Sequence, residues 1–136
     1  LDAQLAVWLS LEHTRFQVPK GASLGIGHVL GGTCDVPHGY TSCVMLPTVL
    51  HWNASHNADR QALVAAAFGQ PSRRACDVVH DFIAGLGMPR SLAAVGVGPE
   101  KFDTNARAAL LDHYLHVNPR PVHGVDDIQD NLRMAA

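Results

Sequence analysis

Charged side chains are scarce in this chain of 136 residues, because Lys, Arg, Asp and Glu together make up only 16% of it. A typical soluble domain carries about a quarter. Ten Lys and Arg nearly balance twelve Asp and Glu, so the net charge is −2 and no basic excess is present to neutralise phosphates. We therefore expect no nucleic-acid partner. The 47% of hydrophobic residues is enough for the core of one domain and excludes a disordered chain.

Cysteine is also rare. The three cysteines, Cys34, Cys43 and Cys76, form no C-x-x-C pair, which excludes a disulfide framework and a cysteine-rich zinc site. This usage favours a reducing, cytoplasmic setting. The sequence has no apolar run long enough to span a membrane. It also lacks the basic segment followed by an apolar one that marks a signal peptide, so we expect no membrane partner. The chain begins at Leu1 inside a helical pattern, and we interpret it as a piece of a longer polypeptide.

Alternation of apolar and polar residues, the mark of a half-buried strand, is absent as well. Apolar residues recur instead with the helical period of 3.6, so the sequence predicts an all-α fold of six or seven helices. Pro47 is expected to begin or kink one helix. A loop is expected around Asn53, between His51 and His56. Ser72 is a candidate N-cap of the helix that follows it. The predicted helices cover residues 1–14, 40–52, 58–68, 75–86, 99–113 and 125–132.

Two motifs have a functional and a structural interpretation, and the structural one is favoured for both. Gly25, Gly27 and Gly31 miss the spacing of the dinucleotide-binding loop by one residue and follow a helix rather than a strand, so close helix packing explains them better. His80 and Asp81 resemble the dipeptide of HD-type metal phosphohydrolases. On the predicted helix each lies about 130° from the apolar stripe, on opposite sides, so we expect two surface groups.

Two of the nine histidines, His28 and His38, stand in the segment GHVLGGTCDVPHGYTSCVMLP, residues 27–47. This segment resembles the signature of the iron-containing alcohol dehydrogenase family, and in particular its maleylacetate reductase-like branch. In that family a helix carries two histidines four apart, and a third follows ten residues later in a P-H-G or P-H-A turn. His28 and His38 match the second and third. Residues 85–92 and the N-P-R-P run at 118–121 are also similar, so the resemblance extends over essentially all of the chain.

The resemblance implies that residues 1–136 are the C-terminal all-helical domain of a dehydroquinate synthase-like, iron-type alcohol dehydrogenase fold, incomplete at its N-terminal side. A nucleotide-binding α/β domain, absent from this chain, would be its partner, and a homodimer is a second candidate assembly. The active site would lie in the cleft between the two domains. The implied reaction is hydride transfer between NAD(P)H and a small carbonyl or alcohol substrate, with a divalent Fe or Zn ion as the family's metal.

The resemblance also assigns roles to individual residues. His38 would be a metal ligand, and His28 would be the catalytic histidine beside the nicotinamide and the substrate. A further ligand position is occupied by Leu24, which cannot coordinate a metal, and the family's D-x-x-x-H pair is absent, so the site is expected to be degenerate. Two interpretations stay open: part of an NAD(P)-dependent oxidoreductase, favoured by His28 and His38, or a non-catalytic helical protein or fragment, favoured by Leu24.

Overall fold

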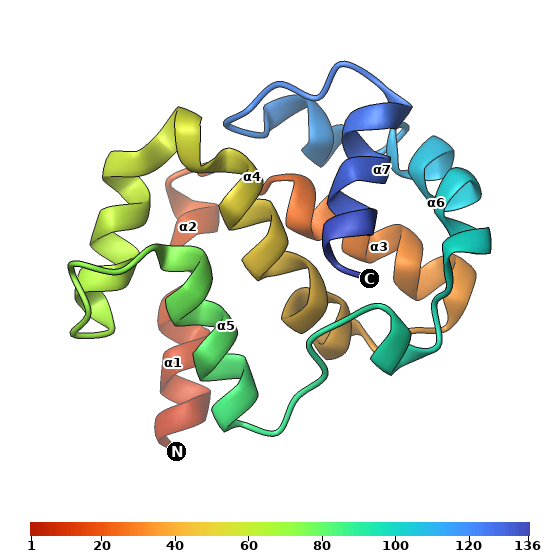
Figure 1. The fold of residues 1–136 in the computed structure, drawn as a ribbon. Helices are drawn as coiled ribbons and strands as arrows, with labels where there is room; N and C mark the ends of the chain where they lie inside the picture. Colours follow the sequence, from red (N-terminus) through yellow and green to blue (C-terminus); the bar gives the residue numbers. More distant parts are fainter.

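The computed structural model describes residues 1–136, apart from the side chains of His13 and Thr14. Helices and turns account for the described chain, without a strand, and the predicted all-α fold is confirmed (Figure 1). None of these helices is long and apolar enough to cross a membrane. The elements are α1 (Asp2–Ser10), α2 (Glu12–Arg15), α3 (Ala22–Cys34), α4 (His38–Ala67), α5 (Ala75–Gly85), α6 (Phe102–Ala109) and α7 (Val125–Met134), with the 3₁₀ helices η1 (Ala93–Val95), η2 (Pro99–Lys101) and η3 (His113–Val117).

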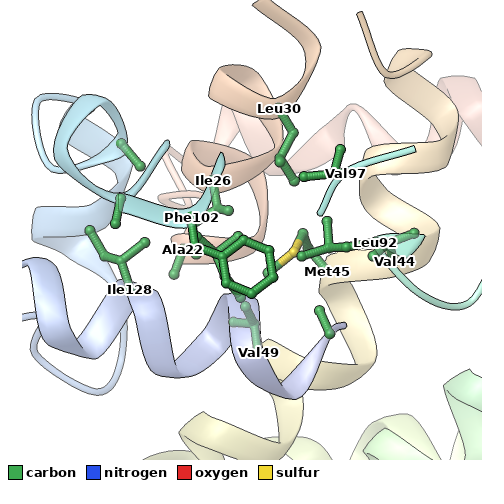
Figure 2. Packing of buried hydrophobic residues seen from close by; sticks show 14 of the residues in the cluster. Ala22, Ile26, Leu30, Val44, Met45, Val49, Leu92, Val97, Phe102 and Ile128 are labelled. Atoms are coloured by element: carbon green, nitrogen blue, oxygen red, sulfur yellow. The ribbon is translucent and has the colours of Figure 1, made fainter. Parts of the chain in front are cut away.

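One hydrophobic core joins α3, α4, α6 and α7. Apolar residues three and four apart on each helix face inward, as the helical period requires. They meet around Met45 of α4 and Phe102 of α6, and Leu92 and Val97 close one side of the cluster (Figure 2). The members drawn from the helices are Ala22, Ile26 and Leu30 of α3, Val44, Met45 and Val49 of α4, Phe102, Ala106 and Ala109 of α6, and Ile128 and Leu132 of α7.

Helix α4 differs most from the sequence prediction. It continues through Pro47 without a break, and Asn53 is helical and buried, so the loop expected between His51 and His56 is wrong. The helix changes direction at Asn57 instead, where the backbone is non-helical (φ −144°, ψ 35°). There the Gln61 Nε2 donates to the Leu50 carbonyl at 2.7 Å and to Asn57 Oδ1 at 2.8 Å. Side-chain amides satisfy polar groups at the bend, and neither the bend nor these bonds follow from hydrophobic periodicity.

Two other helical predictions need correction at their ends. Helix α5 packs on α4 and buries most of the predicted stripe, but Phe82 and Leu86 are exposed. The helix begins after Arg74, without a side-chain cap from Ser72. The predicted amphipathic helix over residues 1–14 is divided into α1 and α2 at Leu11. No residue of α1 is buried, and Trp8 is 68% exposed. The apolar residues of α1 surround the helix rather than forming one stripe, so the pattern did not specify a buried face.

Candidate active site

Helix α3 carries His28, and its glycines let other parts of the chain approach closely. A Cβ at Gly25 would overlap the Leu115 side chain of η3, and a Cβ at Gly27 would lie 3.0 Å from the Thr41 hydroxyl of α4. Both glycines are inside the helix and buried. The predicted packing role is therefore confirmed at Gly25 and Gly27, while Gly31 makes only an ordinary contact; all three lie within a helix and not in a loop.

The His28 ring is held by a carboxylate that lies 84 residues further along the chain. Its Nδ1 lies 2.9 Å from Oδ2 of Asp112, and the His28 side chain is 41% exposed while that of Asp112 is only 15% exposed. The other oxygen of Asp112 accepts the Tyr114 backbone N–H at 2.9 Å. Burial raises the pKa of Asp112, but the hydrogen bonds from Tyr114 and His28 outweigh it and hold this pKa below its usual value.

His38 lies next to His28 in the structure. It is the first residue of α4, and its exposed ring stacks beside that of His28, with 6.3 Å between ring centroids and 24° between planes. Tyr114 meets the His28 ring edge-on, at 5.6 Å and 60°. The two histidines therefore share one surface, with Asp112 and Tyr114 beside them.

The donor set of this surface does not fit a metal ion by itself. Leu24 lies one turn before His28 on the same helix face, where its hydrocarbon side chain offers no ligand. Across the part of the chain that the structure describes, no three His, Cys, Asp or Glu side chains are grouped as metal ligands. Two imidazoles alone bind first-row divalent ions weakly, so ligands from elsewhere would be needed for a tight site.

One further histidine lies at the edge of this surface: His113 Nδ1 is 3.8 Å from Oδ1 of Asp112, and its ring centroid is 3.9 Å from that of Tyr114. Other histidines lie elsewhere in the described structure. His51 and His80 line a cavity of about 310 Å³ together with Cys76, Asp77 and Met134, and burial raises the pKa of the Cys76 thiol. His80 and Asp81 are both on the surface, as predicted. The Arg73 guanidinium is the main cause of a lowered pKa at Asp81. Asp81 is therefore part of a surface ion pair with Arg73.

Sequence reasoning missed Asp112 and Tyr114. The predicted helix over residues 99–113 would have placed Asp112 inside it, but α6 ends at Ala109 and Asp112 becomes the N-cap of η3, in extended backbone. An acidic residue two positions before a backbone N–H that it can accept is a local capping signal. The pairing with His28 depends on the tertiary fold, so the sequence pattern gave no sign of it.

The described structure is thus a helical domain with an exposed acid–base surface. This surface combines a histidine on a closely packed helix, a second histidine at the start of the next helix and a carboxylate beside them. Residues 16–136 match the family model described as Fe-containing alcohol dehydrogenase family, C-terminal. The chain therefore belongs to the iron-containing alcohol dehydrogenase family.

Individual relatives agree with this assignment. The maleylacetate reductase of Rhizobium sp. strain MTP-10005 is 42% identical over 70% of this chain and 26% of its own length. The crystal structure of maleylacetate reductase from Agrobacterium tumefaciens superposes with a TM-score of 0.73 at 36% identity, over 85% of this chain and 31% of that one. A 1,3-propanediol oxidoreductase gives a TM-score of 0.79 at 28% identity, over 85% and 32%. The chain thus spans about a quarter to a third of the length of these relatives.

Proposed function

We propose that residues 1–136 are the C-terminal helical part of an NAD(P)-dependent oxidoreductase that interconverts an alcohol and a carbonyl compound. The observation that carries the proposal is the side-by-side placement of His28 and His38 on one exposed surface, with Asp112 bonded to His28. A nucleotide-binding domain would cover this surface and complete an interdomain cleft. The free thiols of Cys34, Cys43 and Cys76 are consistent with a cytoplasmic protein, and a homodimer is compatible with the proposal.

The chain's own residues would supply acid–base and electrostatic catalysis. In alcohol oxidation the hydroxyl proton would pass to His28, and in carbonyl reduction His28 would return this proton to the developing alkoxide. NAD(P)H, when bound to the partner domain, supplies the hydride chemistry. His38 would donate a hydrogen bond to the developing alkoxide, which is the role left to it where Leu24 removes a metal ligand.

The alternative is a helical protein that keeps the fold without the reaction. Leu24 favours it, because a ligand position of the family holds a hydrocarbon side chain. The pairing of His28 with Asp112 favours the enzyme, because a fold kept for packing alone has no need of a partly exposed histidine held by a carboxylate.

A chimeric enzyme tests the proposal. Residues 16–136 would replace the matching C-terminal segment of the Rhizobium maleylacetate reductase, and NADH oxidation would be followed with maleylacetate. We expect activity that His28→Gln lowers by about a hundredfold or more, as expected for loss of a general acid–base group. His80→Gln on α5 is the matched control and should leave the rate unchanged. A folded chimera without activity, or one indifferent to His28→Gln, would favour the non-catalytic alternative.

A further inference from the structure

Asp112 belongs to the histidine surface although it lies 84 residues after His28 in the sequence. It precedes η3 in extended backbone (φ −80°, ψ 126°), and its Oδ2 lies 2.9 Å from Nδ1 of His28. We propose that Asp112 is a positioning residue that holds the His28 ring in one orientation and in one tautomer, with the proton on Nδ1. The inference deepens the proposed function, since it rests on the assignment of His28 as the proton-transfer group.

Both oxygens of the Asp112 carboxylate have a defined donor. Oδ1 accepts the Tyr114 backbone N–H at 2.9 Å, which leaves Oδ2 to face Nδ1 of His28. The glycine at position 25 lets η3 approach α3 this closely, because a Cβ there would overlap the Leu115 side chain, three residues after Asp112. An ionised carboxylate can only accept hydrogen bonds, so the nitrogen that faces it must carry a proton.

The tautomer decides what His28 can do. Nε2 lies across the ring from Nδ1, so a neutral His28 with its proton on Nδ1 presents the Nε2 lone pair away from Asp112. This nitrogen is then free to take the hydroxyl proton of an alcohol, and to return it from the imidazolium in the reverse reaction. The opposite tautomer would occupy Nε2 with a proton and could not act as the base. A base oriented by a third group is a recurring arrangement in enzymes.

The substitution that separates this role from a purely structural one is Asp112→Asn, which keeps the size of the side chain. Its amide oxygen can still accept the Tyr114 N–H, and the NH₂ group then turns toward Nδ1 of His28. Nδ1 must become an acceptor, so the proton moves to Nε2. A residue that only supports η3 would lower stability on substitution and leave the tautomer unchanged.

Nitrogen-15 NMR of the 136-residue chain labelled at histidine reads the tautomer directly. His28→Gln identifies the His28 signals by their loss, and the pH is raised until the spectrum stops changing, so that the neutral ring is observed. In the unsubstituted chain we expect the Nδ1-protonated form to exceed the other by about tenfold or more, as a hydrogen bond to a charged group provides. Asp112→Asn should abolish or reverse this preference.

Two results would overturn the inference: an unsubstituted chain in which the Nε2-protonated form is equal or dominant, or an Asp112→Asn chain with an unchanged preference. Circular dichroism shows whether the variant folds, and the spectrum of the unsubstituted chain decides the matter if it does not. The measurement needs neither cofactor nor substrate. Failure of the inference is therefore distinguishable from failure of the proposed function, which the activity of the chimera tests.

Discussion

Asn118 of the N-P-R-P motif offers the sharpest test of how the region around the site is held together. Its side chain is buried and makes four hydrogen bonds. Oδ1 accepts the Ala22 backbone N–H at 3.0 Å and the Asn53 amide at 3.2 Å, while Nδ2 donates to Asn53 Oδ1 at 2.7 Å and to the Arg120 carbonyl at 2.8 Å. The Arg120 guanidinium also stacks over the Trp52 ring, 4.1 Å from its centroid. The side chain of Asn118 therefore joins the start of α3, the middle of α4 and the segment after η3.

Asn118→Ala removes these bonds and leaves the Ala22 N–H and the Asn53 amide without their partner. Each net hydrogen bond contributes about 1 kcal/mol, and a stranded buried group costs about 1–3 kcal/mol, so we expect a loss of about 3 kcal/mol in the free energy of unfolding. For a chain of this length the melting temperature should fall by roughly 10–15 °C. Urea unfolding and a thermal melt followed by circular dichroism measure both quantities.

Asn131→Ala is the matched control. Asn131 is also buried, but its side chain makes one hydrogen bond, to the Asp127 carbonyl, and in the described structure its Oδ1 has no partner. Removing an unsatisfied oxygen offsets part of the lost bond, so we expect a loss of about 1 kcal/mol or less. If Asn118→Ala lowers stability no more than Asn131→Ala does, the assignment of Asn118 as the residue that joins these three segments is refuted.

Three further outcomes are expected. Gly25→Ala should lower the melting temperature and weaken the His28–Asp112 hydrogen bond, because its methyl group meets the Leu115 side chain; an unchanged melt would contradict close packing at this position. Leu24→His should raise zinc affinity only modestly in this chain, because the new histidine would have at most His28 and His38 as further ligands. Calorimetry that showed tight stoichiometric zinc binding would contradict the incomplete donor set. The folded-state pKa of Asp112 is lowered, so its contribution to stability is present above the unfolded value of about 4 and is lost as the pH falls below it. The stability of Asp112→Asn should therefore fall less between neutral and acid pH than that of the unsubstituted chain. Identical acid-unfolding profiles for the two chains would refute this contribution of Asp112.

The sequence predicted the features of this protein that depend on short-range pattern. The buried part of the α5 stripe and the short final helix both follow from helical spacing. The family assignment also rests on contiguous residues. The all-α fold needed no knowledge of how the helices pack.

Features set by tertiary contacts were not predictable in the same way. The sequence predicts a loop at Asn53, because an asparagine side chain competes with the helical backbone for hydrogen bonds. In the structure this side chain is hydrogen-bonded to Asn118 instead, and the helix continues. Pro47 reads as a helix breaker, but α4 passes through it. Asp112 reaches the site because α6 ends at Ala109 and η3 packs against α3, and neither feature is indicated by the sequence pattern. For Asn53 and Asp112 the deciding partner lies 65 and 84 residues away in the sequence.

The separation of 84 residues between His28 and Asp112 has a consequence for the order in which this protein folds. Closing so long a loop is entropically unfavourable until the intervening helices have formed, so we expect this contact to form late in folding. During synthesis α3 and the start of α4 emerge first, and His28 has no carboxylate until η3 has followed. The orientation of His28 therefore reports that η3 has packed against α3, and hydrogen exchange of the Tyr114 amide, whose N–H is bonded to Asp112, should be a sensitive measure of that step.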